Sequence, residues 1–234
     1  MKSILRISFV LVVVALFSLT TMAQNVIPAD KIVAGRSYSE WAAAWNQWAT
    51  SIPVSNHPLF DNGDCNVGQS GPVWFLGGKF CSVGATNCGT ANVVRSCTVP
   101  SNKGLFMPII DSEQSVLEMN DPKTQIADMR KTIADAIDQA KDLAFEIDGV
   151  PVHNLKRDFR VLSPAFSFTL PDENFFNAVG EGPYLAGFYY PGVDDGVYVM
   201  LAPLAPGHHV VHFHGFMPQF NFTLDITYML HVKR

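Results

Sequence analysis

Apolar and polar residues alternate near the C-terminal end of the chain, over residues 220–232. The even positions from Phe222 to Leu230 are apolar, whereas most of the odd positions are polar. Because successive side chains of a strand point to opposite faces, this alternation predicts a strand with one buried face and one water-facing side. Two more strands are predicted before it, at residues 208–214 and at residues 197–204. The latter lies between expected turns at Asp194-Asp195-Gly196 and Ala205-Pro206-Gly207.

Residues 144–152 predict a hairpin, because Asp148-Gly149 favours the tight turn that joins two antiparallel strands. Short strands separated by Gly, Pro and Asp turns are typical of antiparallel sandwiches. We therefore predict an α+β protein in which residues 143–234 form an antiparallel immunoglobulin-like β-sandwich. Residues 24–142 are expected to supply two helices and a disulfide-stapled, loop-rich insertion, and residues 24–234 to form one compact domain.

A helix is predicted from residue 37 onward, since Ser37 and Glu40 form a capping box ahead of an alanine-rich segment. Its tryptophans, Trp41, Trp45 and Trp48, recur at helical spacing and therefore project from one face. Such a row is more often the buried side of a helix, and an exposed platform that stacks on sugar rings is the alternative. A second helix is predicted after Pro122, with its buried stripe at positions 126, 129, 133, 137 and 140.

All four cysteines lie in the loop-rich segment 57–110, which also contains two predicted strands, residues 73–76 and 105–110. An even number of cysteines in an exported chain favours disulfides. The nested pairing is expected, Cys65 with Cys97 and Cys81 with Cys88, because the residues between the inner pair can fold back as a short loop. A zinc site is the alternative, although the segment contains no C-x-x-C pair.

The N-terminal segment, residues 1–23, has the three parts of a secretory signal peptide. Lys2 and Arg6 accompany an apolar run over residues 7–19, and Thr21-Met22-Ala23 forms a small-x-small cleavage site. The run is shorter than the ~20 residues that a membrane-spanning helix needs. We therefore expect a secreted or periplasmic protein with no membrane span after cleavage. The net charge of −5 argues against a nucleic-acid partner, which usually needs a basic face.

Four of the seven histidines lie in the predicted strand 208–214, namely His208, His209, His212 and His214. Val211 and Phe213 are expected to face the core, which places His212 and His214 together on the outer face. A turn at residues 215–219 would put His212 opposite Thr223 in the last strand. Asp225 is then the nearest carboxylate on the same face.

These residues form a candidate metal site. Histidines at i and i+2 of a strand are ~6.6 Å apart along the backbone and can converge on one ion. Because imidazole binds both copper and zinc, His212, His214 and Asp225, with water, could hold either of these metals. A water-facing histidine pair without a ligand is the alternative. The more distant residues that would complete the shell are His231, His57 and His153.

The segment His212-Phe213-His214-Gly215 resembles the H-x-H-G copper-ligand segment of the multicopper oxidases. Over these few residues the resemblance implies that His212 and His214 are copper or zinc ligands on a β-sandwich. The chain departs from that family because it has no second H-x-H pair and no cysteine beside a histidine. The oxidase activity is therefore not carried over.

Several common catalytic motifs are absent from the sequence, among them G-x-S-x-G, the Walker A loop and H-E-x-x-H. The leading hypothesis is therefore a secreted or periplasmic, disulfide-bonded protein that binds a partner or a surface, rather than an enzyme. An extracytoplasmic copper- or zinc-dependent enzyme that uses the His212/His214 pair is the alternative. A carbohydrate-binding module that uses Trp41, Trp45 and Trp48 is a third hypothesis.

Overall fold

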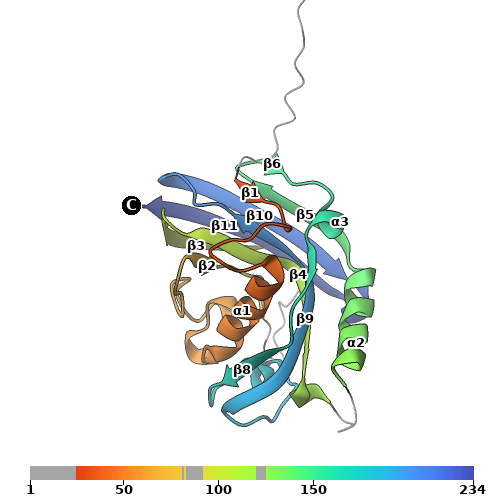
Figure 1. Cartoon of the computed structure of the whole chain (residues 1–234). Coiled ribbons are helices and arrows are strands. Elements are labelled where there is room, and N and C mark those ends of the chain that lie inside the picture. Colours follow the sequence, from red (N-terminus) through yellow and green to blue (C-terminus); the bar gives the residue numbers. More distant parts are fainter. Residues whose placement is uncertain (1–24, 81, 83–91, 120–124) are drawn as a thin grey trace, which may run out of the picture.

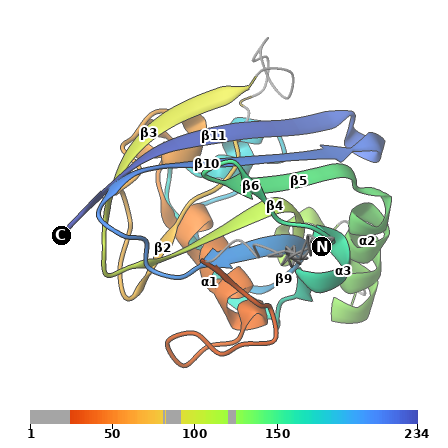
Figure 2. The ribbon, with the colours of Figure 1, turned by 90° about the horizontal axis from the view of Figure 1, so that it is seen from above.

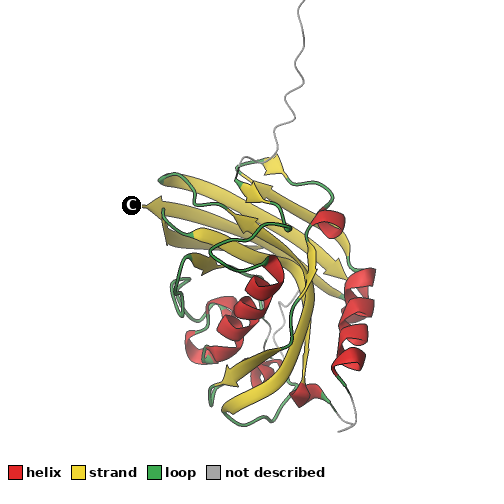
Figure 3. Cartoon of the chain, in the orientation of Figure 1, coloured by secondary structure: helices red, strands yellow, loops and turns green. Residues whose placement is uncertain are grey.

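The computed structural model of the chain describes residues 25–80, 82, 92–119 and 125–234. These residues form α-helices and two multi-stranded sheets, with strands dominant (Figure 3). The predicted α+β class is therefore confirmed. The segment 1–23 lies outside the described residues, and so do Cys81 and Cys88.

The first sheet has five strands in the order β3-β11-β10-β5-β6 (Figure 2). The predicted hairpin is present in it, with Asp148 and Gly149 both at positive φ. β11 runs parallel to β3, while the other pairs are antiparallel. The strands are β3 (Val93–Pro100), β5 (Lys141–Ile147), β6 (Val150–Pro151), β10 (Gly207–Met217) and β11 (Phe222–Lys233).

The second sheet is built on the long strand β9, with the order β1-β9-β4-β2 and with β7 and β8 also paired to β9. β2 and β4 are parallel. The strands are β1 (Val26–Ile27), β2 (Val73–Phe75), β4 (Gly104–Ser115), β7 (Arg160–Leu162), β8 (Phe166–Leu170) and β9 (Gly187–Leu201).

Both sheets therefore mix parallel and antiparallel pairs, so the purely antiparallel prediction is wrong and an immunoglobulin-like sandwich is not confirmed. The physical reason is pairing between strands that no tight turn connects: β3 joins β11 in parallel across more than half of the chain, and β4 joins β2 in parallel as well as β9 in antiparallel. Local alternation and turn residues do not encode such pairs. Strands from residues 24–142 and 143–234 thus share both sheets.

The two long helices are α1 (Tyr38–Ser51) and α2 (Ile126–Gln139), which lie on opposite sides of the β4–β9 sheet (Figure 1). The predicted capping box of α1 is present at Ser37 and Glu40. The shorter helical elements are η1 (Val54–Asn56), η2 (Pro58–Phe60), η3 (Val116–Glu118), α3 (Leu155–Asp158), α4 (Phe175–Val179) and η4 (Pro218–Phe220).

The tryptophans of α1 lie in the core and do not form an exposed platform. Trp41, Trp45 and Trp48 are between 2% and 6% exposed. Each indole N–H donates to a backbone carbonyl, as Trp45 does to Leu76 at 2.7 Å. Burial of three large rings with satisfied N–H groups is the ordinary role of such a stripe. The hypothesis of an exposed carbohydrate-binding platform at these three tryptophans is therefore wrong.

β9 runs without a break through Asp194-Asp195-Gly196, where a turn is predicted from the sequence. Asp194 faces α1 and accepts a hydrogen bond from Tyr198 at 2.9 Å. Asp195 points to the opposite face, where Arg160 donates two hydrogen bonds to it. Tertiary partners on both faces thus hold two aspartates in a strand, although aspartate by itself favours turns.

The predicted disulfide between Cys65 and Cys97 is present, with a Cα–Cα distance of 5.8 Å. It connects the loop after η2 to β3, as expected for a staple between the insertion and the sheet. A disulfide is consistent with an extracytoplasmic protein. None of the described helices is long and apolar enough to cross a membrane.

Candidate functional site

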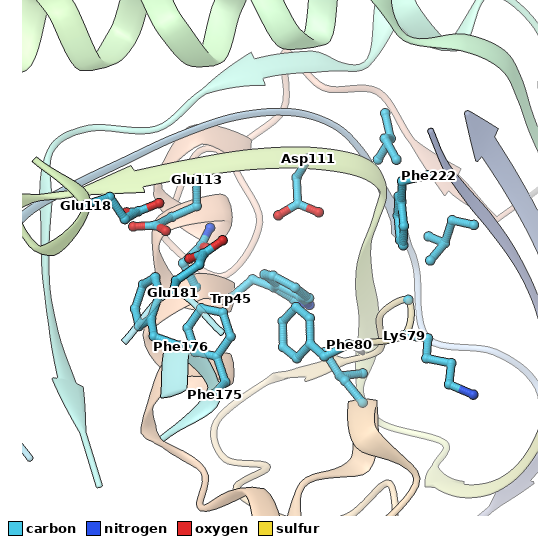
Figure 4. Close-up of a pocket in the computed structure, with 15 residues that line it drawn as sticks. Trp45, Lys79, Phe80, Asp111, Glu113, Glu118, Phe175, Phe176, Glu181 and Phe222 are labelled. Carbon is cyan, nitrogen blue, oxygen red and sulfur yellow. The ribbon is translucent and has the colours of Figure 1, made fainter. Parts of the chain in front are cut away.

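A cavity of roughly 210 Å³ lies between α1, β4, α4 and the start of β11 (Figure 4). Two kinds of side chain dominate its wall. The carboxylates are Asp111, Glu113, Glu118 and Glu181, and the aromatic rings are Trp45, Phe80, Phe175, Phe176 and Phe222.

β4 positions two of the carboxylates. A register shift between Pro108 and Ile110 interrupts its pairing with β9, and the strand then continues to Ser115. Asp111 and Glu113 are two residues apart, so both point to the face that carries α1. Figure 4 shows both side chains projecting from this strand into the cavity. Asp194 lies directly opposite Glu113 on the neighbouring strand.

The other two carboxylates come from separate elements. Ser115 caps η3, and both its N–H and its hydroxyl donate to Glu118, at 2.6 Å and 2.8 Å. Glu181 follows α4 and is exposed, so it stands at the open end of the cavity. Figure 4 shows Glu113, Glu118 and Glu181 gathered at one end of the cavity, with Asp111 farther along the strand.

Aromatic rings form the opposite wall. Phe80 stacks on Phe175 with ring centroids 5.0 Å apart, and Phe175 lies 4.1 Å from Phe176 by the same measure. The nearby loop is held by His57, which accepts from the Leu59 N–H and donates to the Ala49 carbonyl. These packed rings give the cavity a rigid apolar side facing a polar one.

The cavity carboxylates lack cationic partners. Among the described residues, no lysine, arginine or histidine forms an ion pair with any of the four. Lys79 lines the cavity, but its ammonium lies 3.6 Å from Asp61 and points away from the acids (Figure 4). One buried oxygen of Glu113, Oε1, has no hydrogen-bond partner.

Burial without a counter-charge favours the protonated form of a carboxyl group. It raises the pKa of Asp111 to about 7, and that of Glu118 to about 7 in spite of the two hydrogen bonds from Ser115. The pKa of Glu113 is raised well above its ordinary value by burial and by repulsion from Glu118. Burial also raises the pKa of Glu181.

A buried polar layer underlies the acids. Burial and repulsion from Asp111 raise the pKa of Asp194 well above its ordinary value. Its Oδ2 accepts from Tyr198, while its buried Oδ1 has no hydrogen-bond partner. Asn46 is 4% exposed and lies against this layer, because α1 packs its polar edge onto the acids.

The histidine strand β10 has the predicted facing, with Val211 and Phe213 fully buried and His212 outward. Its register with β11 differs by four residues from the predicted one, because β10 extends to Met217 and η4 makes the turn. His212 therefore pairs with Thr227, not with Thr223. An even shift preserves the faces, so Asp225 still lies on the same face as His212.

The structure brings His212 and Asp225 together, with Nε2 2.8 Å from Asp225 Oδ1. The other ring nitrogen of His212 lies 3.6 Å from Glu146 Oε1. His214 donates from Nδ1 to the Asp142 carbonyl at 2.8 Å. Within the described part of the chain, no cluster of three or more histidine, cysteine, aspartate or glutamate side chains has the geometry of a metal site.

The more distant histidines are not near this pair. His57 is buried in the core, and burial lowers its pKa to about 4. His231 stacks on His208 at the far end of β10. His153 is exposed in the segment after β6.

None of the four cavity carboxylates is singled out by the sequence. Asp111 and Glu113 follow the apolar run 105–110, and their two-residue spacing on a continued strand was a usable signal. Glu118 and Glu181 had no such signal, because they come from elements far apart in the sequence.

The comparisons with known proteins identify no family. No protein-family model matches the chain, and no curated protein matches its sequence. A solved structure described as PbICP-C in complex with falcipain-2 is 10% identical, covers 68% of this chain and 97% of its own, and has a TM-score of 0.23. A likeness at this level carries no argument about function.

Proposed function

We propose that the protein binds a small organic ammonium ion in the cavity between α1 and β4. The observation that carries this proposal is the set of carboxylates, Asp111, Glu113, Glu118 and Glu181, with no cationic partner among the described residues. Asp111, Glu113 and Glu118 are half-buried, and Glu181 stands at the open end. An unpaired charge that is withdrawn from water is costly in a folded protein, and a ligand of opposite charge lowers that cost.

The aromatic wall favours an organic cation over a metal ion. Phe80, Phe175 and Phe176 face the acids across the cavity, and the faces of aromatic rings attract ammonium groups. The described acids do not form a metal-holding cluster. An arylalkyl ammonium ion would place its charge at the acids and its ring against the phenylalanines.

Calorimetric titration with phenethylamine and with its neutral analogue 2-phenylethanol tests this proposal. The two molecules differ at the ammonium group, so we expect the amine to bind at least about tenfold more tightly, as a charge-assisted hydrogen bond predicts. A cation lowers the pKa of nearby carboxyls, so binding should release protons and become tighter from pH 5 to pH 8. Equal binding of the two molecules, or of neither, would contradict the proposal.

A second candidate function is the binding of copper or zinc by His212, His214 and Asp225. His214 donates from Nδ1 to a backbone carbonyl, which leaves Nε2 as a free ligand atom. Metal-binding histidines commonly have this arrangement. His212 is likewise flanked by two carboxylates, of which Asp225 would share the ion and Glu146 would orient the ring.

This second candidate predicts that untagged protein retains zinc or copper after gel filtration. Replacing the partly exposed ligand in the variant Asp225→Asn should weaken zinc binding by about tenfold or more, because one anionic ligand is lost. Elemental analysis together with zinc titration measures this. Exposed Asp172→Asn is the matched control, and equal metal binding by both variants would remove the candidate.

The proposed binding protein is also expected to be exported. The signal-like segment 1–23 and the disulfide between Cys65 and Cys97 support a secreted or periplasmic location. N-terminal sequencing of the mature protein tests it: a chain that begins at Gln24 supports cleavage after Ala23, and a chain that begins at Met1 contradicts it.

A further inference from the structure

His208 and His231 lie directly opposite each other on β10 and β11. Their rings are stacked, with centroids 4.7 Å apart and an interplanar angle of 18°. Both residues are exposed, near the end of the two strands that is remote from η4. The pair therefore presents two imidazoles side by side to solvent.

The hydrogen bonding of the two rings differs from that of their neighbour His209. Both nitrogens of His209 are occupied, by Asp148 at 2.7 Å and by the Ala205 carbonyl at 2.9 Å. No hydrogen bond joins a ring nitrogen of His208 or His231 to another described residue. Their lone pairs are thus available to a ligand from solvent.

Cross-strand neighbours of an antiparallel pair have Cβ atoms about 4.5–5.5 Å apart, which suits two-point binding of one ion. Metal–imidazole bonds are about 2.0–2.1 Å long, and the lone pairs of two stacked rings point side by side, so both exposed side chains must rotate to turn one nitrogen of each ring onto a common ion. Imidazole pairs prefer copper(II) and zinc among the common divalent ions, and water completes the coordination.

We propose that His208 and His231 form a two-histidine site for a divalent transition-metal ion, zinc or copper(II), that clips β10 to β11. The site is distinct from the His212, His214 and Asp225 candidate, since His208 is four residues, or ~13 Å of strand, away from His212. It is independent of the cavity and of organic cation binding.

Zinc titration of the full chain without an affinity tag tests the proposal. The variants His208→Asn and His231→Asn should each lower the affinity of one zinc site by at least tenfold at pH 7.5 and abolish its contribution to the zinc-dependent rise in melting temperature. Exposed His153→Asn is the matched control and should bind as wild type does. Both substituted side chains are exposed, so circular dichroism should show unchanged folding.

The variant His212→Asn separates the two metal proposals. It should leave the His208/His231 site intact, so that zinc still raises the melting temperature and that rise disappears when His208→Asn is added. Zinc binding by His208→Asn equal to that of wild type would overturn the inference. So would complete loss of zinc binding in His212→Asn.

Discussion

The protein is expected to be about 3 kcal/mol more stable at pH 5 than at pH 7, the reverse of a protein held together by ionised carboxylates. Asp111 and Glu118 each have a pKa raised to about 7 in the folded chain. In the unfolded chain they ionise near pH 4, so their contribution to stability is complete below that pH and is lost as the pH rises toward 7. Each group loses at most about 1.4 kcal/mol per pH unit and less where the pH is close to its folded or unfolded pKa, so the two together lose about 5 kcal/mol between pH 5 and pH 7.

His57 opposes this trend. Burial lowers its folded pKa to about 4, while the unfolded side chain has the ordinary value of 6.5. Its contribution is complete above pH 6.5 and is lost as the pH falls toward 4. Between pH 6.5 and pH 5 this costs about 2 kcal/mol, which leaves a net difference in the free energy of unfolding near 3 kcal/mol. The pKa values of Glu113 and Asp194 are also raised, so these two acids further favour the fold at pH 5.

Urea unfolding at pH 5, 6 and 7 measures this difference. The double variant Asp111→Asn and Glu118→Gln should flatten the fall of the free energy of unfolding with pH, since neither amide ionises. The exposed pair Asp172→Asn and Glu173→Gln is the matched control and should retain the slope. A wild-type protein that is more stable at pH 7 than at pH 5 would show that the cavity acids are ionised at little cost.

Local sequence patterns predicted individual helices and strands better than they predicted how the strands pair. The capping box at Ser37, the Asp148-Gly149 hairpin and the alternation in β11 all appear as predicted, because each rests on contacts between near neighbours. The parallel pairing of β3 with β11 does not follow from such patterns, since it depends on which sheet edge is free once the rest has folded. The four-residue register error at His212 has a local origin instead: β10 continues to Met217, so η4 places the turn at the end of the predicted segment 215–219.

The candidate cavity shows the same limit more strongly. Glu113, Glu118 and Glu181 come from a strand, a 3-10 turn and a loop, and none has a motif around it. Their shared environment arises when α1 and α4 close over β4. Conversely, the histidine run suggested a metal site because its residues are adjacent in the sequence. In the described fold each of them has a different neighbour: His231 for His208, Asp148 for His209, Asp225 for His212 and the Asp142 carbonyl for His214.

Acids with raised pKa values, gathered in a cavity, weaken the fold at neutral pH. If the cavity wall had only a structural role, amides or apolar residues at these positions would make the fold more stable. Replacing buried ionic groups by apolar residues of similar volume is often neutral or stabilising in other proteins. The cost is understandable if the acids serve a ligand, since functional sites often conflict with stability. This argument predicts opposite effects of one substitution on stability and on binding.

The variant Glu113→Gln should therefore be more stable than wild type at pH 8 and should lose ammonium binding. Its amide avoids the charge of a carboxylate whose Oε1 has no hydrogen-bond partner, so the gain should be on the order of 1–3 kcal/mol at pH 8 and absent at pH 4. Loss of one charge-assisted hydrogen bond should weaken phenethylamine binding by roughly 10- to 100-fold. Urea unfolding at both pH values and calorimetry measure the two effects. Glu173→Gln, an exposed matched control, should change neither, and a Glu113→Gln variant that is destabilised at pH 8 while still binding the amine would assign Glu113 to the scaffold.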